Sequence, residues 1–347
     1  MRSGIIGAGF IGGVHAQAVR AAGGVLSRVA GSSLADGQAG AQRLGALAAA
    51  SAEELIGADD VDVVHICTPN ALHVSLVEQA VAARKAVVCE KPLATTVEDA
   101  QRLHASAAGL VAAVPFVYRY YPTVREVRAR IAADEGGPLW LLHGSYLQDW
   151  LSSSDAANWR VDPAQGGSRA FGDIGVHWCD LMEFTTGHRI TRLCARMGVA
   201  YPERATEDGA AVLFETDRGA CGSVVVSQVS PGRKNRLWFS FDGTSASYSF
   251  DQELPDTLWV GGVAENRVVP RGPDTLSPAA AAYARLPAGH PQGYQECFNA
   301  FVGDVYAAVD GPEPDGLPTF ADGERAAVLT AAVLDSAKND NWVEVSR

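Results

Sequence analysis

The sequence predicts a two-domain α/β protein whose first domain is built on a doubly wound parallel sheet. Short apolar runs alternate with alanine-rich helical stretches over the first third of the chain, a glycine-rich turn follows the first run, and strand patterns dominate after Pro122. The 347 residues are about twice the length of a typical domain. We therefore expect a first domain over residues 1–120, and over 121–347 an α+β domain with a large, mainly antiparallel open sheet.

The first domain alternates between two hydrophobic periods. Runs typical of buried parallel strands occur at 3–6, 26–30, 61–67, 86–89 and 110–116. Helical spacing between them predicts helices at 13–22, 36–44, 71–83 and 96–107. Thr95 and Glu98 fit a capping box at the start of the last helix. Strand followed by helix, repeated in this way, indicates a parallel sheet covered by helices on both faces.

Strands dominate the second domain after one helix at 123–133. The predicted strands are 139–147, 192–199, 209–214, 220–229, 236–242, 246–250, 257–260 and 267–269. Asp217-Arg218-Gly219 and Asp242-Gly243-Thr244 fit hairpin connections, and such short connections favour antiparallel pairing. Helices are predicted at 293–309 and 321–338. Either is a candidate to pack back on the first domain, the C-terminal one in particular.

The glycine-rich turn Gly7-Ala8-Gly9-Phe10-Ile11-Gly12 is a GxGxxG sequence between a predicted strand and a predicted helix. The first glycine allows a tight turn, the second lets backbone amides approach a pyrophosphate, and the third lets the helix pack closely on the strand. The positive end of that helix would face the phosphates. A glycine-rich packing turn is the alternative, but the position at the start of repeated strand–helix units favours a dinucleotide-binding Rossmann domain.

The end of the second strand bears on the choice between NAD and NADP. NAD-binding domains of this kind carry an acidic residue there that accepts from the ribose hydroxyls. Here the strand runs into Gly31, Ser32 and Ser33, and Asp36 lies several residues further along. The two serines can bind a ribose hydroxyl or a 2′-phosphate, and no adjacent arginine selects the phosphate. The sequence leaves both cofactors open.

Two clusters carry candidate chemistry. Glu90-Lys91-Pro92 follows a predicted strand at the edge where an open parallel sheet binds its ligand, and an ammonium there can stabilise charge on a reacting oxygen. Asp173 and His177 share one face at the start of a helix that continues to about Thr186. A carboxylate beside an imidazole prepares it to take a proton from a hydroxyl. The alternatives are a surface lysine, an N-cap aspartate and a structural histidine.

Composition argues against several classes of function. A formal charge of −12 would repel nucleic acids and anionic membranes. No apolar run approaches the ~20 residues of a membrane span, no signal peptide precedes the first strand, and no metal-ligand spacing occurs. The six cysteines form no CxxC pair, and several stand in apolar runs, as reduced thiols do. We expect a cytoplasmic protein. Six histidines have no acidic neighbour comparable to Asp173 in the sequence: His15, His65, His73, His104, His143 and His188.

Together these motifs resemble the Gfo/Idh/MocA oxidoreductases, the family of glucose-fructose oxidoreductase and inositol dehydrogenase. The matching residues run in order over essentially the whole chain: Gly7, Gly9, Gly12, Thr68-Pro69-Asn70 with His73, Glu90-Lys91-Pro92, Tyr118-Arg119, Trp159-Arg160, Gly166-Gly167 and Asp173-x-Gly175-x-His177-x-x-Asp180. Ser32 departs from the pattern, because NAD-preferring relatives carry an acidic residue there.

The resemblance implies a catalytic set of Lys91, Asp173 and His177, with His177 as proton acceptor or donor. It also implies an open sheet that mediates contacts in a homodimer or homotetramer. The residues expected to line the cofactor are Gly7, Gly9, Phe10, Ile11, Gly12, Ser32, Ser33, Thr68, Pro69, Asn70, His73, Glu90 and Lys91.

Aromatic and polar residues after the first domain suit a sugar, whose ring stacks on aromatic faces and whose hydroxyls need hydrogen-bond partners. Beside the catalytic set, the expected substrate contacts are Tyr118, Arg119, Tyr146, Gln148, Trp150, Trp159 and Arg160. Packing roles for the two tryptophans are the alternative. The function expected first is an NAD(P)-dependent sugar or cyclitol dehydrogenase. The resemblance also admits an NAD-dependent glycoside hydrolase that acts by transient oxidation and elimination.

Overall fold

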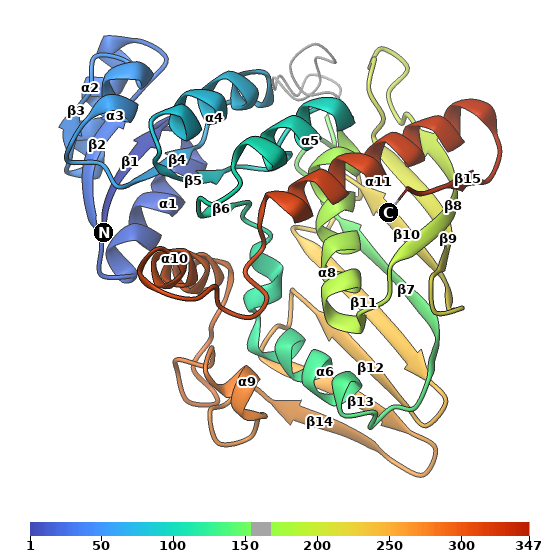
Figure 1. The fold of residues 1–347 in the computed structure, drawn as a ribbon. Helices are drawn as coiled ribbons and strands as arrows, with labels where there is room; N and C mark the ends of the chain where they lie inside the picture. Colours follow the sequence, from blue (N-terminus) through green and yellow to red (C-terminus); the bar gives the residue numbers. More distant parts are fainter. Residues whose placement is uncertain (154–167, 347) are drawn as a thin grey trace. The chain divides into compact units, whose positions relative to one another are not determined.

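The computed structural model describes residues 1–153 and 168–346, and the chain divides into two compact units. One unit comprises Met1–Val117 and Tyr294–Ala327, and the other comprises Tyr118–Gly293 and Val328–Arg347. Helix α11 (Phe320–Asn339) begins in the first unit and ends in the second. The doubly wound parallel sheet and the mainly antiparallel sheet predicted from the sequence are both confirmed (Figure 1).

The first unit contains a six-stranded sheet in the order β3-β2-β1-β4-β5-β6, with all neighbours parallel. Its strands are β1 (Arg2–Ile6), β2 (Val25–Ala30), β3 (Leu47–Ala48), β4 (Val63–Ile66), β5 (Ala86–Cys89) and β6 (Ala112–Ala113). The strand order reverses between β1 and β4, so the chain leaves the carboxyl ends of these two neighbours toward opposite sides of the sheet. Ligands of doubly wound sheets bind at this switch point. The residues that follow β1, β4 and β5 therefore include the candidate cofactor residues.

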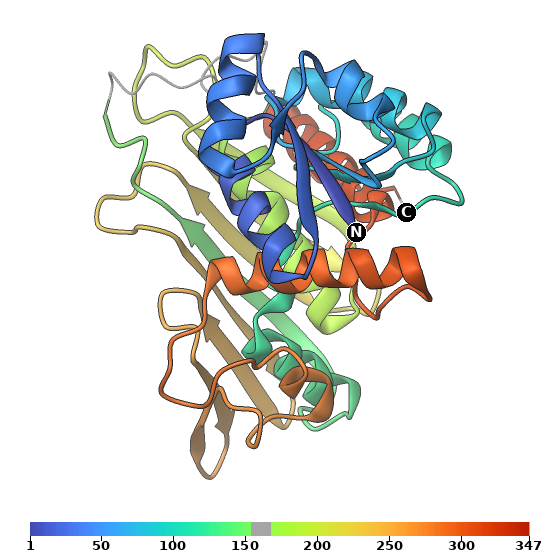
Figure 2. The same ribbon diagram turned by 90° about the vertical axis from the view of Figure 1, so that its left-hand side faces the viewer.

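Helices cover both faces of this sheet. They are α1 (Phe10–Ala21), α2 (Leu34–Leu44), α3 (Ala52–Gly57), the 3₁₀ turn η1 (Asn70–Leu72), α4 (His73–Ala82), α5 (Val97–Ser106) and α10 (Tyr294–Asp310). α10 lies beside α1 (Figures 1 and 2). Gln295 donates to the carbonyl of Val14 over 3.1 Å, and the Phe298 ring meets the His15 ring edge-on at 5.0 Å. The late segment of the chain thus completes the core of the first unit.

Two local predictions for this unit were wrong in detail, and two short elements were not predicted. Thr96 rather than Thr95 caps α5, accepting from the backbone amide of Asp99 over 3.1 Å. The strand expected at 110–116 shrinks to β6. Ala113 forms a bridge with Thr319, and the amide of Val114 donates to the carbonyl of Pro318 over 3.1 Å, in the segment before α11. β3 and α3 went unpredicted because each spans only a few residues, too short to show a period.

The second unit contains a nine-stranded sheet in the order β14-β13-β12-β11-β7-β10-β9-β8-β15. Its strands are β7 (Leu139–Leu147), β8 (Ile190–Gly198), β9 (Gly209–Thr216), β10 (Cys221–Ser227), β11 (Arg236–Gly243), β12 (Ala246–Asp251), β13 (Thr257–Gly262), β14 (Asn266–Pro270) and β15 (Val343–Glu344). β7 and β10 pair in parallel, and the other pairs are antiparallel. Both predicted hairpins are present, joining β9 to β10 and β11 to β12.

Helices pack on one face of this sheet (Figure 1). One is α6 (Pro122–Ala132), which follows the 3₁₀ turn η2 (Val117–Tyr120), and the short α9 (Pro278–Ala281) packs on it. Another is α8 (Val176–Thr186), which continues a π-helical turn, η4 (Phe171–Gly175). Trp178 seats α8, since its indole N–H donates to the carbonyl of Trp238 over 2.9 Å and its ring meets Phe214 and Phe241. Gly144 makes room for that indole: a Cβ there would stand 2.4 Å from the indole nitrogen. The helix that begins near Asp173 is thereby fixed on the sheet.

No helix in the described ranges has the length and apolar character that crossing a membrane requires.

Tyr306 offers a test of how α10 is fixed in the first unit. Its hydroxyl lies 2.7 Å from the buried hydroxyl of Ser3, so Tyr306→Phe should leave Ser3 unsatisfied and cost about 1–3 kcal/mol. Burial raises the pKa of Tyr306 from 10.0 to about 12. The stabilisation from the protonated phenol is therefore complete below the ordinary value and is lost as the pH rises toward the folded value.

Urea unfolding of the wild type and the Tyr306→Phe variant, at neutral pH and across this alkaline range, checks both statements. The variant should lose stability at neutral pH and decline less steeply at alkaline pH. Tyr248→Phe is the matched control, because the Tyr248 hydroxyl is buried without a hydrogen-bond partner in the described residues. Equal losses in the two variants would contradict the assigned role of the Ser3 contact.

Candidate active site

The glycine-rich turn leaves β1 with the geometry that a dinucleotide requires. Gly7 has φ +101°, and a Cβ there would stand 2.4 Å from the carbonyl oxygen of Cys67. A Cβ on Gly12 would stand 2.1 Å from the carbonyl oxygen of Gly7, whereas one on Gly9 would meet nothing within 4 Å. Gly9 caps α1 without a side-chain hydrogen bond, and no acidic residue lies in the first turn. The backbone amides of this helix start are therefore suited to the anionic pyrophosphate of a dinucleotide.

The strand β2 ends without an acidic residue, as expected, but the carboxylate of Asp36 in the first turn of α2 reaches back to the segment after the strand. Oδ2 of Asp36 accepts from the backbone amide of Ser32 over 2.8 Å and from the Ser32 hydroxyl over 3.1 Å. Ser33 caps α2 by accepting from the amide of Asp36 over 3.2 Å. The cap therefore folds the first turn of α2 back toward the strand end. The Asp36 side chain therefore lies beside the residues that follow β2.

His73 ties together two loops expected to line the cofactor. Its buried ring lies 2.8 Å from the carbonyl oxygen of Pro92 through Nδ1 and 3.0 Å from that of Thr68 through Nε2. Burial lowers the pKa of His73, so the neutral ring donates to one carbonyl at a time. The hydroxyl of Thr68 is buried without a hydrogen-bond partner among the described residues, which suits contact with a ligand. The buried ring of His73 thus links the loop after β4 to the loop after β5.

Glu90 is the end of a buried polar chain that the sequence did not reveal. Its Oε1 lies 3.1 Å from Nε2 of His15, whose Nδ1 lies 3.0 Å from Nδ1 of His65. Burial would raise the pKa of Glu90, but the hydrogen bond to His15 and nearby positive charges hold it below its ordinary value. Burial keeps the pKa of His65 well below its ordinary value. Ionised Glu90 therefore accepts from His15, and a hydrogen bond between Nδ1 of His15 and Nδ1 of His65 extends the chain.

Lys91 follows Glu90 at the carboxyl end of β5, as predicted from the sequence. Oε2 of Glu90 accepts from the backbone amide of Lys91 over 3.1 Å, and the Lys91–Pro92 peptide bond is cis. The polar chain behind Glu90 thus fixes the backbone that carries the lysine. The sequence did not indicate a role for His15 or His65, because the contacts that join them are distant in the chain. Glu90 lies 75 residues from His15, and His65 lies 50 residues from it.

In the second unit, Asp173 lies in the π-helical turn and His177 in the first turn of α8. The backbone amide of Asp173 donates to the carbonyl of Arg169 over 2.8 Å. Its Oδ2 accepts from Nε2 of Gln228 over 2.7 Å. His177 is 8% exposed, so its side chain is buried. Gln228 follows β10 and gave no signal in the sequence.

Aromatic rings surround His177 on its own unit. The Tyr118 ring meets the imidazole edge-on at 5.0 Å, and the Tyr146 ring lies 6.4 Å away. The hydroxyls of Tyr118 and Tyr146 bond to each other, and that of Tyr146 donates to Asn235 over 2.7 Å. Gln148 also donates to Asn235 over 2.7 Å, and the Trp150 indole donates to Gln148 over 2.8 Å. Four predicted substrate residues are thus joined by Asn235, which the sequence did not single out.

Arg119 occupies a different environment from these residues. It forms a two-point ion pair with Asp180, in which Nε lies 2.9 Å from Oδ2, and both side chains are buried. Its guanidinium also lies 4.9 Å from the centre of the Phe184 ring. These contacts hold α8 against the segment before α6. The two remaining predicted substrate residues, Trp159 and Arg160, lie outside the described residues.

Comparison with known proteins agrees with this arrangement. Residues 1–114 match the family model described as "Oxidoreductase family, NAD-binding Rossmann fold", and residues 124–249 match the "GFO/IDH/MocA C-terminal domain". Levoglucosan dehydrogenase of Pseudarthrobacter phenanthrenivorans is 30% identical over 84% of this chain and 82% of its own length. Inositol 2-dehydrogenase of an Arthrobacter species is 28% identical over 99% and 96%.

Among solved structures, a levoglucosan dehydrogenase in complex with NADH and L-sorbose superposes with a TM-score of 0.94. The two chains are 28% identical, and the match covers 100% of this chain and 99% of that one. The sequence matches extend through both halves of the molecule, and the fold match is complete. This chain belongs to the GFO/IDH/MocA family of oxidoreductases.

Proposed function

We propose that this protein is a dehydrogenase that moves a hydride between a nicotinamide dinucleotide and a secondary hydroxyl or ketone of a sugar, sugar derivative or cyclitol. The observation that carries the proposal is the environment of His177. Asp173 stands one turn before it, and the polar face of Tyr118, Tyr146 and Asn235 lies around it. Such a set of hydroxyl and amide groups suits a polyhydroxylated ring.

The two units divide this work in the proposal. The first unit carries the glycine-rich turn and Lys91 and binds the dinucleotide. The second unit carries Asp173 and His177 and binds the substrate. Residues 294–327 belong with the first unit, because α10 packs on α1. We place the protein in the cytoplasm, where its six free cysteines stay reduced.

A bound nicotinamide would accept the hydride in the oxidative direction and donate it in the reductive direction. His177 takes the proton of the substrate hydroxyl in the oxidative direction and returns it in the reductive direction. Asp173 holds the imidazole in the required tautomer. The ammonium of Lys91 stabilises negative charge that develops on a substrate oxygen.

The relatives support a ring substrate. Levoglucosan dehydrogenase and inositol 2-dehydrogenase act, by their names, on a sugar anhydride and a cyclitol. These names favour a dehydrogenase over a glycoside hydrolase, which would cleave its substrate without net turnover of the cofactor. A panel of levoglucosan, inositols, sugars and glycosides, assayed with NAD and NADP separately by nicotinamide absorbance, tests the proposal. Glycoside cleavage without net NAD(P)H formation would overturn it.

The catalytic set is tested by single substitutions assayed on the best substrate of that panel. Lys91→Met should lower kcat/KM by about 100- to 1,000-fold. His177→Gln should lower it by about 100- to 10,000-fold, because proton transfer then falls to water. Lys338→Met, at an exposed lysine of α11, serves as the control and should leave kcat/KM unchanged. Wild-type kcat/KM in Lys91→Met or His177→Gln would remove that residue from the set.

Asp36 should favour NAD over NADP. Its carboxylate at the end of β2 would repel a 2′-phosphate and accept from a free ribose hydroxyl. We expect tighter binding of NADH than of NADPH in fluorescence titrations, and Asp36→Asn should narrow the ratio of the two dissociation constants by about tenfold. Glu54→Gln is the control. The Glu54 carboxylate accepts from the amide of Ala50, and the amide of Glu54 donates to the hydroxyl oxygen of Ser51, which repeats the arrangement at the start of α2. An unchanged ratio in Asp36→Asn would exclude this role.

Self-association is proposed for the open face of the nine-stranded sheet. Alternate residues of β9 and β10 point away from the helices, and they leave Leu213 55% and Val225 47% exposed. Replacing both with aspartate should convert a dimer or tetramer to a monomer in light-scattering measurements, since two charges would be buried without partners. Thr191→Asp, at a half-exposed position of β8, is a control for added charge. A wild type that is already monomeric would exclude this proposal.

A further inference from the structure

Gln228 is a buried amide in contact with Asp173. It follows β10 directly, is 0% exposed, and donates from Nε2 to Oδ2 of Asp173 over 2.7 Å. Oε1 of the same amide is buried and has no hydrogen-bond partner within residues 1–153 and 168–346. A buried amide that satisfies only one polar atom costs stability. Folding stability alone therefore does not explain a glutamine at this position.

The orientation of the amide follows from the chemistry of its partner. An ionised carboxylate accepts hydrogen bonds and donates none. Nε2 must then face Asp173 and Oε1 must point away, as found. A hydrogen bond of this kind favours the charged form of the carboxylate. Gln228 supplies it without adding a charge beside His177.

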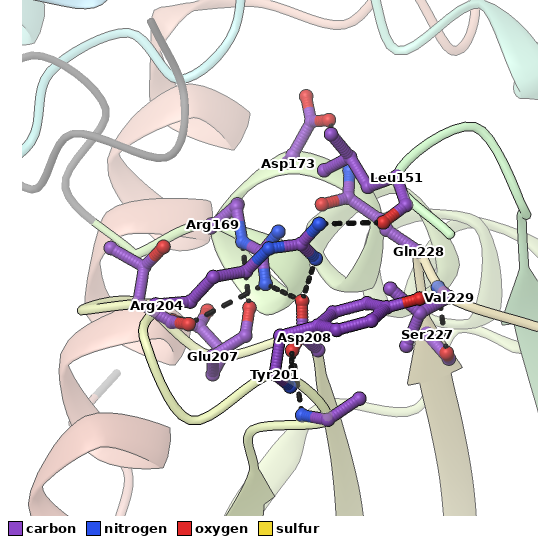
Figure 3. A network of polar contacts seen from close by, with 12 residues as sticks. Leu151, Arg169, Asp173, Tyr201, Arg204, Glu207, Asp208, Ser227, Gln228 and Val229 are labelled. Atoms are coloured by element: carbon purple, nitrogen blue, oxygen red, sulfur yellow. Dashed lines mark hydrogen bonds and ion pairs between the residues drawn. The ribbon is translucent and has the colours of Figure 1, made fainter. Parts of the chain in front are cut away.

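The backbone of Gln228 is fixed on both sides. Its amide donates to the carbonyl of Asp208 over 3.0 Å, and its carbonyl accepts from the amide of Leu151 over 3.2 Å. The Asp208 carboxylate is in turn bonded by Arg169 and by Arg204, the latter over 2.5 Å. Figure 3 shows Asp173 and Gln228 beside this group of paired charges.

Glu207, which precedes Asp208 in the chain, fixes the turn that carries Asp173. Its Oε1 accepts from the Ser168 hydroxyl over 2.6 Å and from the amide of Phe171 over 3.2 Å, at the start of the turn that carries Asp173. Two consecutive residues, Glu207 and Asp208, therefore hold both ends of the Asp173–Gln228 contact. Charged side chains near the contact in the described residues include Arg169, Arg204, Glu207 and Asp208, and His177 lies one turn after Asp173.

We propose that Gln228 is a positioning residue for the reaction: its amide keeps Asp173 ionised and aimed, so that Asp173 can hold the imidazole of His177. This rests on the proposed function, because it requires Asp173 to take part in the chemistry. The proposal adds Gln228, which follows β10, to the residues that control proton transfer.

The test compares Gln228→Leu, which removes the donor at similar volume, with Gln228→Glu, which opposes a second carboxylate to Asp173. We expect the acid limb of the profile of kcat/KM against pH to move upward by about one pH unit in Gln228→Leu and further in Gln228→Glu. At neutral pH, kcat should fall by about 10- to 100-fold with little change in KM. A carboxyl ¹³C titration of aspartate-labelled protein, with the Asp173 signal assigned by Asp173→Asn, should show the same shift without turnover.

Gln292→Leu is the matched control. Gln292 is also buried in the second unit, and its amide bonds to the backbone of Tyr283 over 2.8 Å and of Arg285 over 3.1 Å. It should lower the melting temperature and leave the acid limb in place. If both Gln228 variants keep the wild-type acid limb while Asp173→Asn is impaired, the positioning role is wrong and the proposed function stands. If Asp173→Asn keeps wild-type kcat/KM, both are wrong.

Discussion

The buried charge of Asp208 is the constraint on which the candidate site of the second unit depends. Burial would raise the pKa of this carboxyl, but hydrogen bonds from Arg169 and Arg204 hold it below its ordinary value. An ion taken out of water must keep all its partners, because losing one leaves a charge uncompensated. Arg204 also bonds to the carbonyls of Leu151 and Ser153. One carboxylate therefore fixes three separate segments around Asp173.

Short-range patterns made most of the fold predictable. The apolar runs of β1, β2, β4 and β5, the glycine spacing after β1 and the alternation of the later strands are each patterns contained within a few consecutive residues. Such contacts leave a period that can be read directly. The parallel pairing of β7 with β10 left no such trace, since the two strands are far apart and share a sheet only in the folded chain.

Sequence motifs single out the proposed reacting groups of the candidate site, but they do not reveal the residues that support these groups. Lys91 and the pair of Asp173 and His177 stand in compact motifs, whereas Glu90 meets His15 across 75 residues and Asp173 meets Gln228 across 55. Asp36 was misplaced for a local reason. Its distance along the chain suggested separation from the strand end, but the Ser33 cap folds the helix start back onto it.

In both units, buried residues hold the proposed reacting groups in place through hydrogen bonds. In the first unit, His15 holds Glu90, and Glu90 holds the backbone of Lys91. In the second, Asp208 holds the backbone of Gln228, and Gln228 holds the carboxylate of Asp173. Each support is buried and bonded within its own unit, so it does not need the substrate to form. Groups fixed in this way lose little freedom when a substrate binds, and more of the binding energy is left to favour hydride transfer.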